Sequence, residues 1–340
     1  MNRNRPDGPT VHRIQLDMDK GRPGEVSCFL IENREPRDRE EREKGKVKDS
    51  VETEVSGEIT LVDAGPEKAS DELRRKLGIL GCSYEDIDNI LVTHPHGDHI
   101  GNINRILQEG DPRLYTHESV PEYLNTDEET VRETAREIGL KGEPLEESVG
   151  EWTSTLERNR RTLPINEIDV FLGDGDTIQT SGTEFTAVDL PGHQSTHHCY
   201  RCGDTFFTGD GLIEAFRPIL LGPGFSPGIF DAGFRYVEGL RRLREMDPGY
   251  CYPGHGVPFG DVCEVIDETL LKVENTVSRV EEALGRFDSA SAGDVAYYLG
   301  DDMDELRYWV FESPASLGYL ESEDRVSSWM EDGVRRFRTK

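Results

Sequence analysis

Short apolar runs alternate with amphipathic segments along most of this chain. The runs have the length of strands, whereas the amphipathic segments repeat apolar residues with the spacing of a helix. The apolar runs predict strands at 11–16, 26–31, 59–62, 87–92, 113–116, 169–172, 177–178, 184–190, 199–202, 205–208 and 250–252. Helical spacing predicts helices at 68–80, 100–107, 127–140, 232–246 and 261–284. Periodicity alone therefore indicates an α/β or α+β protein.

Three stretches depart from this alternation. Residues 32–57 are almost wholly charged and polar, so we expect a solvated, poorly ordered loop between two strands. Residues 119–164 form a helical insert, of mixed character over 152–163, which would act as a lid or only cover a hydrophobic face. Beyond residue 286 the character changes again, with short helices expected at 291–299 and 305–311 and a helix end that enters a wing at 317–326. We expect a main domain over 1–286 and a small C-terminal domain over 287–340.

The chain carries a large excess of negative charge. Its 340 residues include 68 Asp and Glu against 39 Lys and Arg, which gives a formal net charge of −29. Such a surface repels polyanions at low salt, so nucleic acid is an unfavourable partner. A halophilic origin would explain the excess, and molar salt would then screen the repulsion beyond ~3 Å. We expect a cytoplasmic protein without membrane contact, because the chain lacks both a signal-peptide core and a run of ~20 apolar residues.

Four short blocks carry candidate metal ligands, and each block follows an apolar run of strand length. The blocks are Thr93-His-Pro-His-Gly-Asp-His99, Pro191-Gly-His193, Thr208-Gly-Asp210 and Pro253-Gly-His255. Together they supply five imidazoles and two carboxylates, from His94, His96, Asp98, His99, His193, Asp210 and His255. These side chains suit borderline divalent ions, with zinc ahead of iron or manganese.

The first block is the strongest signal. A single histidine after a strand usually has an ordinary core or surface role, and a Pro-Gly or Asp-Gly pair usually marks a turn. The first block instead places four candidate ligands within six positions at the end of a predicted strand. Buried together, these side chains would all need hydrogen-bond partners, and as cations they would repel one another. A bound metal removes both difficulties.

The spacing His-x-His-x-Asp-His, followed by His, Asp and His, resembles the metallo-β-lactamase superfamily. This resemblance implies an α+β fold, a four-layer αββα sandwich, as the catalytic domain over residues 1–286. Residues 287–340 look like the small winged-helix tail of many hydrolases in the superfamily. Because this tail is acidic, we expect it to be structural, to form a pocket wall or to form a dimer, rather than to bind DNA.

The resemblance also implies a role for each candidate residue. One metal ion would be bound by His94, His96 and His193. The second would be bound by Asp98, His99 and His255. Asp210 would bridge the ions, and Asp98 would also orient the hydroxide that they share. Asp63, at the end of another predicted strand, would hold a ligand loop or imidazole in place. The expected cofactors are two zinc ions, with iron or manganese as alternatives.

Four sequence differences from well-known members of this superfamily argue against the activities of those members. Asp210 and the polar N-terminus argue against a true metallo-β-lactamase. His96 stands where diiron oxygen-reducing relatives have Glu. The stretch between Asp210 and His255 is too short for the extra domain of nucleases that process mRNA 3′ ends. Gly101-Asn102 replaces the Gly-Gly typical of glyoxalase II relatives.

These departures favour a metal-dependent hydrolase of a small thioester, ester or lactone. One alternative is an endoribonuclease or phosphodiesterase, for which Arg241, Arg242 and Arg244 give the best local support. A second alternative is a mononuclear iron enzyme similar to persulfide dioxygenases, which would not use His255 as a ligand. The expected partner is a small-molecule substrate, and the one protein partner considered is a second copy in a homodimer.

Overall fold

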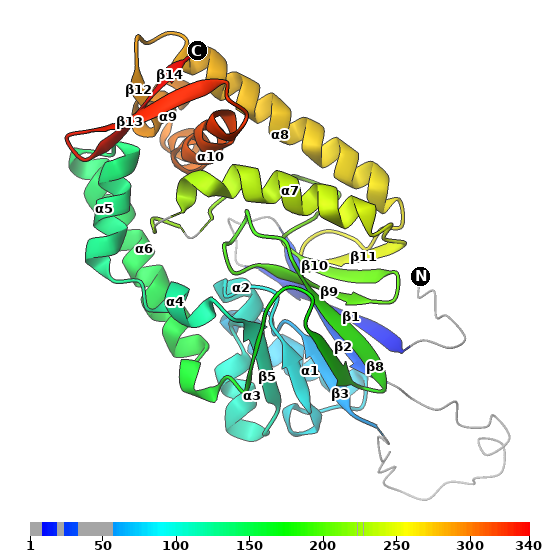
Figure 1. Cartoon of the computed structure of the whole chain (residues 1–340). Helices are drawn as coiled ribbons and strands as arrows, with labels where there is room; N and C mark the ends of the chain where they lie inside the picture. Colours follow the sequence, from blue (N-terminus) through cyan, green and yellow to red (C-terminus); the bar gives the residue numbers. More distant parts are fainter. Residues whose placement is uncertain (1–8, 19–23, 33–56, 223, 227) are drawn as a thin grey trace, which may run out of the picture.

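The computed structural model describes residues 9–18, 24–32, 57–222, 224–226 and 228–340. Most of the charged stretch that the sequence predicts to be a loop, residues 33–56, lies outside the described residues. Within the described part, two β-sheets stack on each other and helices cover their outer faces (Figure 1). The expected four-layer αββα arrangement is therefore confirmed.

The first sheet has six strands in chain order, β1 to β6. The strands are β1 (Thr10–Asp17), β2 (Glu25–Glu32), β3 (Ile59–Val62), β4 (Asn89–Leu91), β5 (Arg113–His117) and β6 (Val170–Leu172). The first three are antiparallel neighbours, and β3 to β6 run parallel. Parallel neighbours end at the same edge of a sheet, so the loops that follow β3 and β4 lie side by side.

The second sheet has five strands, in the order β11-β10-β9-β8-β7. The strands are β7 (Thr177–Thr180), β8 (Thr183–Asp189), β9 (His198–Cys202), β10 (Thr205–Gly209) and β11 (Tyr250–Pro253). Neighbours are antiparallel except for β10 and β11, which are parallel. Between the two sheets lies a core rich in aromatic rings, where Phe29 of β2 packs against Phe207 of β10 at 5.5 Å between ring centroids.

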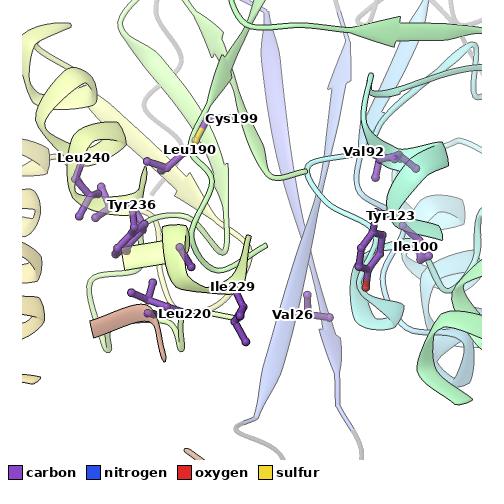
Figure 2. Close-up of a cluster of buried hydrophobic side chains, with 14 of the residues drawn as sticks. Val26, Val92, Ile100, Tyr123, Leu190, Cys199, Leu220, Ile229, Tyr236 and Leu240 are labelled. Atoms are coloured by element: carbon purple, nitrogen blue, oxygen red, sulfur yellow. The ribbon is translucent and has the colours of Figure 1, made fainter. Parts of the chain in front are cut away.

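Helices bury the outer face of each sheet. On the first sheet these include α1 (Ser70–Ile79) and α3 (Ile103–Glu109), and on the second α7 (Ala232–Glu245), against which α8 (Val262–Leu284) packs in turn (Figure 1). Figure 2 shows Tyr236 and Leu240 of α7 beside Leu190, which directly follows β8, and Cys199 of β9. Short 3-10 helices lie at Glu67–Ala69, Tyr84–Asp86, Ile165–Glu167 and Ile229–Asp231. No helix in the described ranges is long and apolar enough to cross a membrane.

The predicted helix at 100–107 is confirmed over 103–107 but starts too early, because two helices meet there. The first is α2 (Gly97–Ile100), and α3 begins at Ile103. At the junction, a Cβ on Gly101 would lie 2.1 Å from the backbone nitrogen of Glu67. The side chain of Asn102 donates to the carbonyl oxygens of Ala64, at 2.8 Å, and Pro66, at 2.9 Å. Close packing against the loop after β3 therefore interrupts the helix and explains the Gly101-Asn102 pair.

The insert consists of α4 (Val120–Leu124), α5 (Glu128–Ile138) and α6 (Gly142–Thr162). The mixed character predicted for 152–163 is wrong, because this stretch is the second half of the 21-residue α6. The buried residues of α6 recur every three or four positions, at Leu145, Val149, Trp152, Leu156 and Asn159. The helical period begins before residue 152 and includes a buried Asn, which hides it in a search for apolar spacing alone.

The C-terminal part combines two helices with a small sheet. Its elements are β12 (Ala290–Ser291), α9 (Ala292–Leu299), α10 (Met303–Ser322), β13 (Val326–Glu331) and β14 (Val334–Thr339), with the sheet order β12-β14-β13. The helix predicted at 305–311 and the helix end predicted from residue 317 form one continuous helix, because α10 has 20 residues and includes Pro314. Packing against α7 stabilises this continuation: a Cβ on Gly233 would lie 2.3 Å from the carbonyl oxygen of Ala315. The winged-helix assignment and the boundary at 286/287 stay predictions.

Candidate metal centre

The structure brings all seven predicted ligands into one cluster at the ends of strands. They come from the loop after β4 with α2, and from the loops after β8, β10 and β11. Three groups have candidate donor atoms that all lie within 4.8 Å of one another: His94, His96 and His193; His94, His99 and Asp210; Asp98, His99 and His255. The first and third of these groups are the two sets that the family resemblance implies. Their roles as ligands stay predictions, and the following distances decide whether metal ions would fit.

The three-histidine group has its ring nitrogens turned toward a common point. His96 Nδ1 lies 3.0 Å from His94 Nε2 and 3.1 Å from His193 Nε2. Donor atoms around a tetrahedral zinc ion, each 2.0–2.1 Å from the metal, are about 3.3 Å apart. The spacing of these nitrogens is therefore close to that of a zinc site.

The other group includes His255 and Asp98, and Asp210 lies between the two groups. His255 Nε2 is 3.4 Å from Asp98 Oδ2. Asp210 Oδ1 is 3.4 Å from His99 Nε2, and its Oδ2 is 3.5 Å from both His193 Nε2 and His255 Nε2. A carboxylate with oxygens facing ligand candidates of both groups is the arrangement that a bridging ligand requires.

Contacts on the far side of three imidazoles determine which nitrogen faces the cluster. His193 Nδ1 donates to the carbonyl oxygen of Ile219 at 2.9 Å, and His255 Nδ1 donates to that of Glu25 at 2.8 Å. His99 Nδ1 lies 2.8 Å from Asp63 Oδ2. Because these partners accept hydrogen bonds, the proton is held on Nδ1 and the Nε2 lone pair is left for a metal.

Asp63 forms hydrogen bonds both with His99 and with the loop after β4 that carries His94 and His96. Besides its contact with His99, its carboxylate accepts hydrogen bonds from the backbone nitrogen and the hydroxyl of Thr93, each at 2.8 Å. Its backbone is left-handed, with φ of 56°, a conformation in which Asp is more common than most residues. The contacts are those expected for the predicted positioning role of Asp63.

Burial and charge act differently on the two groups. Burial, together with the His193 ring, lowers the pKa of His96 to about 3, and burial lowers the pKa of His94 well below its usual value. Burial also opposes the charge of His255, but Asp210 and Asp98 outweigh it and raise its pKa to about 10. The three-histidine group is therefore already in the neutral form that binds metals. Metal binding by His255 would have to displace a proton.

Two buried atoms in the cluster have no hydrogen-bond partner among the described residues, namely His99 Nε2 and Asp210 Oδ1. Leaving buried polar atoms unpaired is costly, so such atoms are uncommon in native proteins. Metal coordination would satisfy both. The backbone also approaches closely, since a Cβ on Gly254 would lie 2.6 Å from His99 Cε1 and 2.7 Å from Asp210 Oδ1. The residues present thus fit divalent metal binding.

The cluster opens into a cavity of about 1140 Å³. His96, Asp98, His193 and Asp210 line its inner end. The remaining walls come largely from α6 of the insert and α10 of the C-terminal part, whose residues the sequence did not single out. The lid and pocket-wall roles considered for these two segments were the signals that the sequence offered. The insert and the C-terminal part both form walls of the pocket.

The arginine patch that supported a nuclease is neutralised. Arg241 pairs with Glu238 at 2.8 Å, Arg242 with Asp174 at 2.7 Å and Arg244 with Asp267 at 2.6 Å. A polyanion would have to compete with these carboxylates for each guanidinium. The patch is a set of surface ion pairs, as expected for a solvated helix face.

Comparisons with known proteins all relate this chain to one superfamily. The metallo-beta-lactamase superfamily matches residues 51–255, more than half of the chain. Probable metallo-hydrolase YqjP of Bacillus subtilis (strain 168) is 24% identical over 302 residues, which cover 83% of this chain and 90% of that protein. Atrochrysone carboxyl ACP thioesterase of Aspergillus fumigatus is 24% identical over 208 residues, 61% of this chain but 37% of that protein.

A solved structure has the same fold over nearly the whole chain. It is that of a metallo-beta-lactamase family protein from Thermus thermophilus, with a TM-score of 0.72 and 22% identity. The match covers 97% of this chain and 98% of that one, so the C-terminal helices and small sheet are part of the shared fold. With its αββα sandwich, its cluster of histidines and aspartates at strand ends and this match over more than half of its length, the chain belongs to the metallo-beta-lactamase superfamily.

Proposed function

We propose that this chain is a metal-dependent hydrolase of a small thioester, ester or lactone, with two divalent ions as cofactors and zinc as the first candidate. The observation that carries the proposal is the position of Asp210. Its two carboxylate oxygens face nitrogens of both histidine groups at 3.4–3.5 Å, and the residue lines a cavity large enough for a small substrate.

The residues of the cluster would have separate roles in metal binding and catalysis. His94, His96 and His193 would hold one ion. Asp98, His99 and His255 would hold the other, with Asp210 between them. Bound zinc lowers the pKa of water to about 7 and polarises a scissile carbonyl group. Asp98 lines the cavity, so its carboxylate can accept a hydrogen bond from the attacking water and orient it. For a thioester, water adds to the carbonyl carbon, the carbon–sulfur bond breaks, and a carboxylic acid and a thiol are released.

Two kinds of observation support a small acyl substrate. One relative carries the name of a thioesterase, and another that of a metallo-hydrolase. The acidic composition and the paired arginines of α7 disfavour a polyanion. A phosphodiester substrate is therefore the outcome that would replace this proposal.

The test combines metal analysis with a substrate panel. Protein purified without added metal should contain about two ions per chain and hydrolyse at least one thioester, ester or lactone. Asp210→Ala should abolish turnover with an unchanged circular dichroism spectrum, whereas Asp111→Ala, at an exposed loop position, should behave like wild type. One ion per chain, with normal metal binding by His255→Ala, would exclude the two-metal arrangement and favour the mononuclear iron alternative.

A further inference from the structure

The cavity beside the candidate metal centre has one apolar wall. This wall consists of Ile219, Leu221, Leu306, Val310 and Phe311, from the loop after β10 and from α10. Trp152 and Phe225, which also line the cavity, form an aromatic cluster with Phe311: the ring centroids of Phe225 and Phe311 are 4.9 Å apart, and those of Trp152 and Phe311 5.9 Å. The wall is thus supported by packed rings from three separate segments of the chain.

The apolar wall begins at the metal centre itself. The carbonyl oxygen of Ile219 accepts the hydrogen bond from His193 Nδ1 at 2.9 Å, while 37% of Ile219 remains exposed. At the other end, Met303 in the first turn of α10 is 53% exposed and also lines the cavity. Apolar surface of this kind gains free energy when a ligand covers it. A chain lying on it would extend directly from a carbonyl group held at the metal centre.

A second side of the cavity, formed by the end of β1 and by residues 67–72, is acidic: Asp17, Glu67, Asp71 and Glu72 line it. Two further carboxylates of the lining, Glu147 and Glu151 of α6, lie next to α10 and pair with Arg307, one of the three cations of the lining, at 3.0 Å and 2.9 Å. A leaving group with several negative charges would be repelled on this side, whereas an uncharged one would not.

From these two walls we propose a substrate class: thioesters with an uncharged, medium-length apolar acyl chain and an uncharged leaving group. The proposal rests on the hydrolase function proposed above. The acyl chain lies along Ile219, Leu221, Leu306 and Phe311, and the leaving group faces the acidic side. A cavity of about 1140 Å³ is slightly larger than ordinary ligand sites of roughly 300–1,000 Å³ and much larger than an acetyl group needs.

The test measures binding separately from turnover. The probes are thioethers of N-acetylcysteamine with alkyl chains of two to ten carbons, which cannot be hydrolysed and carry no charge. The zinc-loaded enzyme should bind them more tightly as the chain grows, by roughly fourfold for each methylene group that becomes buried. The same alkyl chains on coenzyme A, which carries several negative charges, should bind at least tenfold more weakly at ~0.1 M salt. Equal affinity for the two series would overturn the choice of leaving group.

Two variants locate the chain in the cavity. Leu306→Ala should reduce the gain per methylene for long chains and leave the binding of the two-carbon probe unchanged. Met303→Ser should also reduce the gain in affinity per methylene. Because Met303 is exposed, this variant should fold even if Leu306→Ala does not. Leu271→Ala is the matched control, because Leu271 lies on α8, is 66% exposed and does not line the cavity.

The outcomes separate this proposal from the proposed reaction. Chain-length-dependent binding that both cavity variants reduce, without hydrolysis of any thioester, would support the apolar subsite and reject the reaction. Thioester hydrolysis without any dependence on chain length would support the reaction and overturn the subsite. The subsite is also overturned if Leu306→Ala and Met303→Ser both match Leu271→Ala.

Discussion

Glu312 and Arg217 form a buried ion pair that joins the C-terminal helix to the metal centre. Glu312 Oε2 lies 2.9 Å from Arg217 Nη2, with only 1% and 6% of the two side chains exposed. The other carboxylate oxygen of Glu312 accepts from the backbone nitrogen of Leu220 at 2.9 Å. The preceding residue, Ile219, accepts from His193. Through this short chain of contacts, α10 fixes the loop that orients one candidate ligand.

Removing one partner of this pair should destabilise the protein strongly. Glu312→Ala leaves the Arg217 guanidinium buried without its carboxylate, and we expect a loss of about 3–5 kcal/mol in the free energy of unfolding. The matched control is Glu238→Ala, because the Arg241–Glu238 pair is exposed at 52% on both sides and should contribute less than about 1 kcal/mol. Urea unfolding of the metal-free proteins measures both values.

Replacing both partners gives the second half of the test. An apolar pair, Arg217→Met with Glu312→Leu, removes the unpaired charge and should recover part of the lost stability. If Glu312→Ala cost no more than Glu238→Ala, the pair would have no structural importance, and the proposed link from α10 to His193 would lose its basis.

Asp63 should affect metal affinity more than folding. Asp63→Asn keeps the shape and tolerates the left-handed backbone, but an amide is a weaker acceptor for His99 Nδ1 than a carboxylate. We expect metal affinity to fall by about 10–100-fold, measured by competition with a chelator. Asp111→Asn, at an exposed position, should have no effect. Wild-type affinity in Asp63→Asn would show that the contact with His99 does not tune the site.

The sequence predicts the residues of the metal cluster but not those of the pocket walls, and this difference has a physical cause. His94, His96, Asp98 and His99 are close in sequence, and the resemblance to the superfamily, carried by four short local motifs, added His193, Asp210 and His255 to the predicted cluster. The pocket walls depend on tertiary packing between segments that share no local spacing, such as Trp152 and Phe311. Their apolar side chains look like ordinary core residues until the fold places them beside a cavity.

Helix lengths were underestimated for a related reason. The missed middle of α10, residues 312–316, includes Glu312 and Pro314, which interrupt an apolar pattern. In the structure, Arg217 neutralises the first, and α7 packs closely beside the second. Long-range contacts thus stabilise a helix that local propensity would end early.

The charged loop should be dispensable. Glu32 and Ile59 are paired neighbours in antiparallel β2 and β3, so a tight turn can join the two strands directly. The deletion should retain Glu58, whose carboxylate accepts from the backbone nitrogen of Ser181 at 3.0 Å. Closure entropy changes by only about 0.6 kcal/mol for each halving of a loop, so stability should change by less than about 2 kcal/mol. Urea unfolding and kcat of the shortened protein check this, and loss of both would show that residues 33–56 are needed.

Substrate preference should depend on charge and therefore on salt. An anionic protein opposes a polyanion but admits an uncharged substrate, so thioester or lactone hydrolysis should far exceed cleavage of single-stranded RNA at ~0.1 M salt. There the screening length is ~10 Å, whereas in molar salt it falls to ~3 Å and the repulsion largely disappears. If the shape of the pocket excludes RNA, RNA cleavage should stay slow at both salt concentrations. If only the negative surface charge excludes RNA, its cleavage should rise steeply with salt. Efficient metal-dependent RNA cleavage without acyl hydrolysis at either concentration would reverse the ranking and favour a nuclease.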